Sequence, residues 1–286
     1  MSISSKVPWW AKIAAKCTLA RVPVPYAAWR RMGIFVHGKM LDAQYSRHVF
    51  EQHLAQARAH GVQPRSVLEL GPGDSVATAI WARAAGAERT TLVDAGRFAT
   101  DGPPAYRAAL AAAEMDAAIA DAPTLDAMLE RLHARYLCEG LASLRALPDA
   151  SVDFAFSNAV LEHVFRDEFE ETCRQLLRIQ APGSIGSHRV DLRDHLGGKL
   201  ESLRFSPELW EKPWFARSGF YTNRLRASQV RAAFQKAGFE ILSCEERRWE
   251  RLPTPRSTMH PSFSKLEEAD LLVSGILLVV RRPGSA

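Results

Sequence analysis

The sequence predicts an α/β fold built on a doubly wound, mostly parallel sheet. Short strand-like apolar segments alternate with helical segments through most of the chain. A glycine-rich break directly follows the first of these strands, as in sheets that bind ligands at their strand ends. The last two strand segments follow one another without a helix between them, which indicates an antiparallel final strand.

The elements are expected in a regular order along the 286 residues. We interpret residues 1–60 as an N-terminal helical cap, broken by prolines and ending in a long helix before Gly61. Residues 61–286 are interpreted as the main domain, with insertions at about 95–135 and 193–226. Strands are expected at 66–70, 90–94, 135–140, 151–158, 184–192, 239–249 and 269–280. Helices are expected at 75–86, 103–135, 165–180 and 228–238.

The composition is that of a soluble globular protein, with 47% apolar and 24% charged residues. The four cysteines are far apart and form no CxxC pair, which argues against a disulfide framework or a zinc site. The longest apolar run, 269–280, is too short to span a bilayer, and the N-terminus lacks the apolar core of a signal peptide. We therefore expect a cytoplasmic protein without stable membrane insertion and without a metal.

Basic residues are concentrated at the N-terminus. Residues 1–60 contain nine Lys and Arg against two acids, a net charge of +7, within a total of +5. Together with Trp9 and Trp10, this leader could contact anionic lipid or nucleic acid. The alternative is an amphipathic cap whose basic side chains face water. We favour the alternative and expect no nucleic-acid partner, because neither a sustained basic stripe nor an RNA-binding motif follows.

The segment VLELGPGDS is the main candidate for ligand binding. Gly71 and Gly73 let the backbone approach a ligand that a Cβ would block. A dinucleotide fingerprint would need a third glycine where Val76 stands, and a phosphate-binding P-loop would need a Lys followed by Ser or Thr. Glu69 and Asp74 would in addition repel a pyrophosphate. The segment therefore favours a cationic ligand without phosphate.

S-adenosylmethionine (SAM) meets this description, because it carries a sulfonium and an ammonium group. Asp94 ends the next strand, about twenty residues beyond the loop, where a carboxylate can accept both ribose hydroxyls. NAD would use the same acid. Asp94 alone therefore does not separate the two cofactors, and the loop favours SAM.

Four segments together resemble the class I SAM-dependent methyltransferases: VLELGPGDS, TLVDAG, LPDASVDFAFSNAVLEHV and LLRIQAPGSI. They stand in the family's order over roughly residues 60–190. The resemblance implies a Rossmann-like, doubly wound, seven-stranded sheet of order 3-2-1-4-5-7-6 with the last strand antiparallel. It also implies that SAM is bound by residues Glu69, Gly71, Gly73, Asp74, Asp94, Leu141 and Asn158. Two departures are Ser75 in place of a third glycine, and the lack of an acid two to four residues before Leu147 for the adenine.

Methyl transfer to oxygen or nitrogen requires the acceptor to lose a proton, so a base is expected. His163 lies just after the fourth strand, and His188 and Asp191 lie at or near the end of the fifth. For each histidine the alternative is a hydrogen-bonded structural residue. A metal bound by His188, Asp191, Asp194 and His195 is conceivable, but the spacing matches no ligand motif.

The second insertion is expected to shape the acceptor pocket. Tyr221, Asn223, Arg224 and Arg226 are crowded together there, and His195 lies at its start. Arginine forks match carboxylates and phosphates. The alternative is a loop that its arginines hold to nearby carbonyls and carboxylates.

The function that these patterns favour is methylation of a small molecule or sugar, on oxygen before nitrogen. Residues 187–226 also look like a subgroup associated with bacterial cell-envelope glycans and secondary metabolites. Two alternatives remain open: SAM-using cyclisation or elimination without methyl transfer, and a non-catalytic SAM- or RNA-binding protein. The sequence does not predict the oligomeric state.

Overall fold

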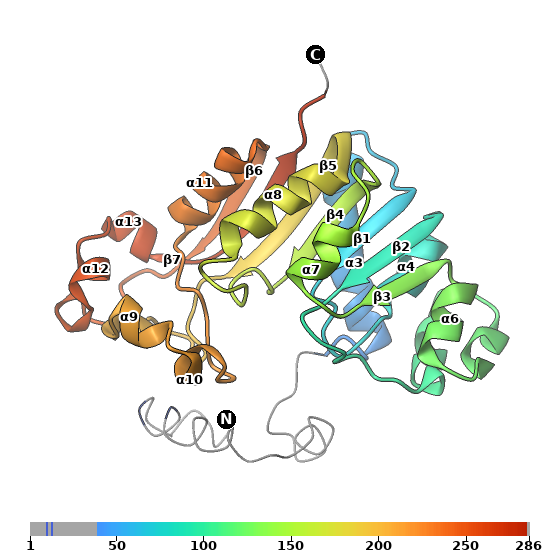
Figure 1. Cartoon of the computed structure of the whole chain (residues 1–286), viewed down its shortest axis with the longest axis horizontal. Helices are drawn as coiled ribbons and strands as arrows, with labels where there is room; N and C mark the ends of the chain where they lie inside the picture. Colours follow the sequence, from blue (N-terminus) through green and yellow to red (C-terminus); the bar gives the residue numbers. More distant parts are fainter. Residues whose placement is uncertain (1–9, 11–12, 14–38, 285–286) are drawn as a thin grey trace.

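The computed structural model describes Trp10, Ile13 and residues 39–284, so most of the expected N-terminal cap lies outside the described residues. The described chain forms a seven-stranded sheet of order β3-β2-β1-β4-β5-β7-β6, as predicted (Figure 1). The strands are β1 Ser66–Leu70, β2 Arg89–Val93, β3 Ala134–Leu137, β4 Val152–Asn158, β5 Gln180–Asp191, β6 Glu240–Arg248 and β7 Val273–Arg281. β7 runs antiparallel to both β5 and β6, and the other neighbours are parallel.

Helices cover both faces of the sheet. One face carries α7 (Leu141–Ala146), α8 (Phe169–Ile179) and α11 (Ala227–Ala237), which lie toward the viewer in Figure 1. The opposite face carries α3 (Ala43–Ala59), α4 (Thr78–Ala84) and α5 (Arg107–Ala112). The remaining helices are short: α6 Leu125–Arg131, α9 Pro207–Trp210, α10 Pro213–Ala216, α12 Pro261–Ser264 and α13 Glu268–Leu271. Among the described residues, none of the helices combines the length and the apolar character needed to cross a membrane.

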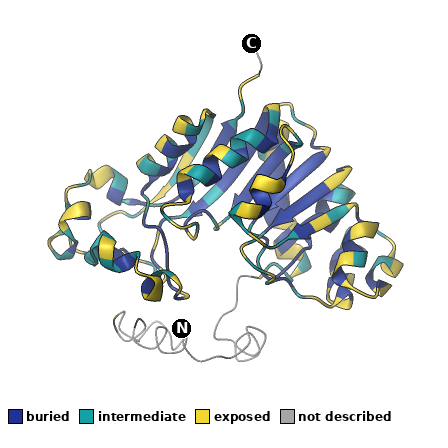
Figure 2. Cartoon of the chain, viewed as in Figure 1, coloured by how far each residue is buried: buried dark blue, intermediate teal, exposed yellow. Residues whose placement is uncertain are grey.

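Two apolar cores, one on each face, follow from the alternation of side chains along the strands. Val67 packs with α3 and α4 residues, whereas Leu68 and Leu70 pack with α8 and α11 residues. All five residues of β1 are buried, as expected for a central parallel strand. Figure 2 shows the same distribution, with the central strands buried, the edge strands β3 and β6 partly exposed, and exposed residues on the outer sides of the helices.

The helix expected over 103–135 is divided into short pieces. The 3₁₀ turns η2 (Pro103–Tyr106) and η3 (Ala117–Asp121) alternate with α5 and α6. Glu114 has a left-handed backbone with φ of 55° just after α5 ends, and Thr124 caps the start of α6. The high alanine content of the segment therefore does not produce one continuous helix.

The second insertion is built around aromatic packing rather than around a long helix. Residues 193–226 contain η4 (Glu201–Arg204), α9 and α10, and Trp210, Phe215 and Phe220 pack together within them. The segment between β6 and β7, which includes η5 (Arg256–Thr258), packs Met259 and Phe263 against Leu203 of the insertion.

Helix α3 lies directly on the sheet. Phe50, His53 and Leu54 on its inner side are buried, and His53 reaches Ser187 of β5 with Nδ1 2.8 Å from Oγ. Helix α3, the last part of the expected cap, is therefore one of the helices that cover the sheet.

Candidate functional site

The carboxyl ends of β1, β2 and β4 lie side by side, because Leu70 pairs with both Val93 and Ser157. The glycine-rich loop follows β1 at this edge. The Gly73 amide donates to Asp94 Oδ2 over 3.0 Å, and the Ala95 amide donates to Oδ1 over 2.7 Å. The structure therefore brings together the loop and the acid that the sequence singled out.

Gly71 has a conformation and surroundings that only glycine fits. Its φ is +72°, in the left-handed region, and a Cβ at this position would lie 2.3 Å from a methyl group of Val160. Val160 belongs to the loop after β4, so the loops from two neighbouring strands meet over bare backbone. The close approach of a ligand to this backbone, which the Gly-Pro-Gly break predicts, stays a prediction.

Carboxylates dominate the electrostatics of this edge. Burial raises the pKa of Glu69 to about 8, against a hydrogen bond from Thr78, and Oε2 has no hydrogen-bond partner in the described part of the chain. Burial also raises the pKa of Asp94 to about 6, although the amides of Gly73 and Ala95 oppose the shift. At neutral pH Asp94 is ionised and would repel a diphosphate, whereas a cationic group beside Glu69 would favour the ionised form of Glu69.

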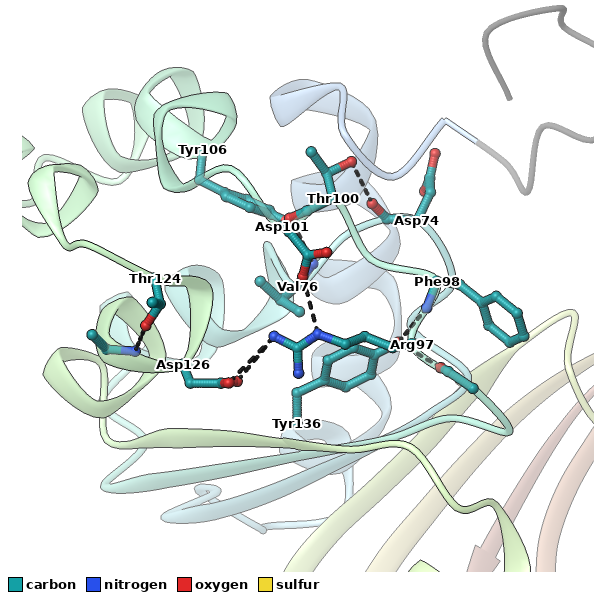
Figure 3. Close-up of polar contacts among 12 residues, drawn as sticks. Asp74, Val76, Arg97, Phe98, Thr100, Asp101, Tyr106, Thr124, Asp126 and Tyr136 are labelled. Atoms are coloured by element: carbon teal, nitrogen blue, oxygen red, sulfur yellow. Dashed lines mark hydrogen bonds and ion pairs between the residues drawn. The ribbon is translucent and has the colours of Figure 1, made fainter. Parts of the chain in front are cut away.

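The loop after β2, residues 95–102, is held firmly against the sheet (Figure 3). The Tyr136 hydroxyl of β3 donates to the Gly96 carbonyl over 3.0 Å and accepts from the Phe98 amide over 3.1 Å. Arg97 pairs with Asp101 at 3.0 Å and with Asp126 at 3.3 Å. The Arg97 guanidinium is thus engaged by two carboxylates.

The same loop is also joined to the glycine-rich loop. The Thr100 amide donates to the Asp74 carbonyl over 3.0 Å, and the Tyr106 hydroxyl donates to the Thr100 carbonyl over 2.9 Å (Figure 3). Tyr106 accepts in turn from the Val76 amide. Asp74 is buried where these loops meet, so the sequence correctly placed it at this edge but did not predict its role in joining the loops.

Two histidines lie together beyond β4 and β5. His163 and His195 are both exposed, and their rings meet edge to face with centroids 4.8 Å apart. His163 Nδ1 lies 3.1 Å from the carbonyl oxygen of Tyr221, so Nδ1 carries the hydrogen in the neutral ring. The lone pair is then on Nε2, which can accept a proton.

Asp191, at the end of β5, forms an ion pair with Arg193. Their side chains meet at 2.9 Å and 2.8 Å, through Nε to Oδ1 and Nη2 to Oδ2. Burial alone would raise the pKa of Asp191, but the Arg193 side chain and backbone amide outweigh it and lower the pKa. Asp191 is therefore held as a carboxylate beside the two histidines.

Residues 42–244, which contain all of these features, match a methyltransferase domain family. The chain belongs to this family. SAM is its cofactor, and the acidic, glycine-lined edge fits that cation. No protein of curated function matches the sequence.

Several solved structures are similar to this methyltransferase. A SAM-dependent methyltransferase from Mesorhizobium loti is 18% identical, with 80% of this chain and 96% of that chain covered and a TM-score of 0.45. The N-methyltransferase NodS from Bradyrhizobium japonicum is 13% identical, covering 85% and 98% of the two chains, with a TM-score of 0.41. The [4+2]-cyclase SpnF is 16% identical, covering 85% and 82%, with a TM-score of 0.48. At these identities the likeness concerns the fold alone.

His188 lies in the core of the methyltransferase rather than at a strand tip. It is fully buried, its Nδ1 is 2.9 Å from Ser157 Oγ, and its ring packs beside Phe234 of α11. Burial lowers its pKa to about 3. The catalytic role expected from the sequence does not fit this position, because β5 continues for three more residues and α11 covers the ring.

Two of the residues expected to bind the acceptor are also buried within the fold. The Tyr221 hydroxyl donates to Glu211 over 2.7 Å. The Asn223 side-chain amide donates to the carbonyls of Leu161 and Val164 over 2.8 Å and 3.0 Å. Both residues tie the second insertion to the loop after β4, and Asn223 also lines a small pocket with Glu162 and Asp191.

The two arginines expected beside them behave in the same way. Arg224 donates to the carbonyls of Ser202 and Phe205 and lies over the Trp210 ring at 5.0 Å. Arg226 is 1% exposed and donates to the carbonyls of Leu192 and Val273. The alternative interpretation of the sequence, a loop held by its arginines, therefore describes this segment.

Three polar residues at this edge were not predicted. Glu139 follows β3, next to Gly140, whose amide donates to the Asp94 carbonyl over 2.8 Å. The family pattern has an acid two to four residues before Leu147, whereas α7 separates Glu139 from Leu147. Leu141, which was expected near the adenine, is the first residue of α7. His53 lies beside Asn158, which ends β4. Glu162 is visible in the sequence next to His163, and burial raises its pKa to about 8.

The described residues contain no group of three or more His, Cys, Asp or Glu side chains placed to hold a metal ion. Asp194, named with His188 as a conceivable ligand, instead accepts the amides of Leu196 and Gly197 and shapes the turn that carries His195.

Proposed function

We propose that this methyltransferase methylates an oxygen of a small-molecule or sugar acceptor, with His163 as the general base. The observation that carries the proposal is the hydrogen bond from His163 Nδ1 to the Tyr221 carbonyl, which leaves the lone pair of the neutral ring on Nε2. His163 follows β4 directly, five residues beyond Asn158 at the donor edge.

The donor is held by the carboxyl ends of the first strands in this proposal. Asp94 accepts the ribose hydroxyls, and Glu69 balances the positive charge of the amino-acid portion. Gly71, Gly73 and the buried Asp74 form the close backbone wall, and Asn158 borders the opposite side. Glu139 and the start of α7 at Leu141 receive the adenine. When bound, SAM supplies a methyl group that is already activated by its positive sulfur.

The acceptor is held beyond β4 and β5. His163 accepts the proton that the acceptor hydroxyl loses, which contributes roughly 10²–10⁴-fold to the rate. His195 contacts the acceptor and fixes the His163 ring from its edge. The Asp191–Arg193 ion pair lies beside the two histidines. Its Asp191 carboxylate stabilises the positive charge that develops on the His163 imidazole when the ring accepts the proton.

The test is product analysis with SAM and a panel of hydroxylated and amino-bearing sugars and small aromatic molecules. S-adenosylhomocysteine together with an O-methyl product supports the proposal. Products methylated only on nitrogen would contradict the choice of oxygen. Methylthioadenosine formed from SAM alone would instead support the cyclisation or elimination alternative.

A further inference from the structure

A second cavity lies at the opposite edge of the sheet from the donor site. It has a volume of about 440 Å³, within the usual range for small-molecule pockets. It is lined by the starts of β1 to β4 and the segments before them: Ser66, Arg89, Thr90, Thr91, His133, Ala134, Arg135, Leu147, Pro148, Ser151 and Val152. In Figure 1, α7, α8 and α11 lie on the near face over β4 to β7, and β2 and β3 are uncovered on that face.

The charged residues of this cavity are all basic. Arg89, His133 and Arg135 line it, and no Asp or Glu does. Glu88 pairs with Arg65 and also lies close enough to Arg89 for Arg89 to lower its pKa, whereas Asp153 accepts the amides of Arg65 and Ser66. Leu147 and Val152 supply an apolar wall beside the basic groups.

Arg135 is oriented by the sheet. Thr91 and Arg135 are register partners on β2 and β3, so both side chains project from the face that carries α7. Arg135 Nε donates to Thr91 Oγ1 over 3.2 Å. Within the described chain, the terminal guanidinium nitrogens of Arg135 form no hydrogen bond or ion pair, and neither does the side chain of Arg89. Because Thr91 Oγ1 accepts from Arg135, its own hydrogen remains to be donated.

The cavity cannot be part of the methyl-transfer site. β1 and β2 are each five residues long, and the cavity lies at their starts and reaches Thr91 in the middle of β2. At about 3.3 Å per residue, the strand starts lie roughly 15 Å from the donor edge, and Thr91, three residues before Asp94, lies roughly 10 Å from it. A ligand here would therefore bind at the same time as SAM and the acceptor.

We infer that this cavity, named here the basic cavity, is a second ligand site that binds a small organic phosphate. Two arginines and an imidazole surround the phosphate, and the Thr91 hydroxyl donates to it. Arginine is suited to this role because its planar fork donates two parallel hydrogen bonds to a phosphate. The apolar wall accommodates the uncharged part of the ligand, such as a base or sugar ring.

The experiment is calorimetric titration of the full chain with UMP, in the presence of saturating S-adenosylhomocysteine so that the donor site is filled. Uridine is the matched ligand without phosphate. Arg89→Gln and Arg135→Gln are the test variants, and Arg107→Gln, on a surface arginine paired with Asp121, is the matched control. S-adenosylhomocysteine affinity and the melting temperature report whether each variant is folded.

The inference requires UMP to bind at a single site, with uridine at least about tenfold weaker, since hydrogen bonds to a charged group contribute that much. Each test variant should weaken UMP binding by about tenfold or more and leave S-adenosylhomocysteine affinity unchanged. Arg107→Gln should leave the affinity for both ligands unchanged. Equal binding of UMP and uridine, UMP affinity that survives both substitutions, or displacement of S-adenosylhomocysteine by UMP would each overturn it. The absence of UMP binding up to roughly 10 mM would do the same.

Discussion

Asp94 and Gly73 are joined by a hydrogen bond of 3.0 Å from the Gly73 amide to the Asp94 carboxylate. The Asp94 carbonyl also accepts the Gly140 amide over 2.8 Å. The tip of β2 therefore holds both the loop after β1 and the start of α7 after β3. A single residue thus sets the shape of the donor edge and carries one of its charges.

Replacing Asp94 by Asn should weaken SAM binding and change its dependence on pH. Burial raises the Asp94 pKa to about 6, so in the wild type SAM affinity should fall as the pH drops below about 6 and the carboxylate is protonated. The variant should bind roughly 10–100-fold more weakly at pH 8 and lose the part of the fall that begins below pH 6, keeping only the pH dependence that comes from Glu69, whose pKa is about 8. Calorimetry from pH 5 to 8 measures both effects. Asp101→Asn, on the exposed outer part of the loop, is the control and should bind SAM within about twofold of wild type.

Replacing Gly71 by Ala should disrupt the donor edge. The left-handed φ of +72° costs about 1 kcal/mol for a residue with a Cβ, and that Cβ would meet Val160 at 2.3 Å. We expect a lower melting temperature and at least a tenfold loss of SAM affinity. The double variant Gly71→Ala, Val160→Ala removes the two methyl contacts but keeps the Cβ at position 160, 2.9 Å from the new Cβ, and the backbone strain, so it should recover only part of the affinity. Full SAM affinity in the single variant would contradict the close approach.

The donor edge could be predicted from sequence because it depends on local patterns, whereas the strand order was implied by the resemblance to the methyltransferase family. The carboxyl ends of parallel strands meet at one edge, so the loop glycines and Asp94 had to lie close together once β1 and β2 were recognised. Bare backbone and carboxylates in that loop then favoured a cation over a diphosphate. None of these steps required knowledge of distant contacts.

The acceptor side could not be predicted in the same way. Arg226 stands in a polar, irregular segment, and only the folded chain reveals that it donates to carbonyls at the end of β5 and the start of β7. His188 sits in an apparently polar stretch, SHRVD, yet its side of the strand faces α11. A polar residue that bonds inside the core has the same sequence signature as one that meets a ligand.

His163 and His188 should respond differently to substitution. His163→Ala should lower kcat by about 10²–10⁴-fold and leave SAM affinity and the melting temperature near wild type, because the ring is exposed and is the proposed base. His188→Ala should instead lower the free energy of unfolding by about 2–4 kcal/mol, because it removes the hydrogen bond between His188 and the Ser157 hydroxyl and opens a cavity in the core. Turnover by folded His188→Ala should stay within a few fold of wild type. Full turnover of His163→Ala would exclude it as the base.

Replacing Arg226 by Lys tests whether this arginine supports the fold or binds the acceptor. Lys keeps the charge but cannot reach carbonyls from both Leu192 and the Asp270–Val273 segment with one ammonium. The free energy of unfolding should fall by about 2–4 kcal/mol, measured by urea denaturation, while KM for the acceptor is unchanged at low temperature. A raised KM for the acceptor with an unchanged free energy of unfolding would instead indicate that Arg226 binds the acceptor.

Glu162 should make the protein less stable as the pH rises. Burial raises its pKa from the ordinary 4.5 to about 8, so the native state favours the protonated form. The resulting stability is complete below about pH 4.5 and is lost as the pH rises through 8, at a rate of about 1.4 kcal/mol per pH unit. Glu162→Gln keeps the shape and cannot ionise, so it should be more stable than wild type at alkaline pH.

Other buried groups titrate over the same range, so the informative quantity is the difference between variant and wild type. His53, with a pKa lowered by burial to about 4, loses stability as the pH falls below 6.5 and opposes Glu162 between 4.5 and 6.5. Because His53 is present in both proteins, its contribution cancels in the difference. Urea denaturation at pH 5, 6, 7 and 8 should give curves that differ least at pH 5 and diverge steadily toward pH 8. If the free energies of unfolding of variant and wild type instead changed in parallel with pH, Glu162 would be ionised in the native state at neutral pH. Its negative charge would then be balanced by Arg193, which is paired with Asp191.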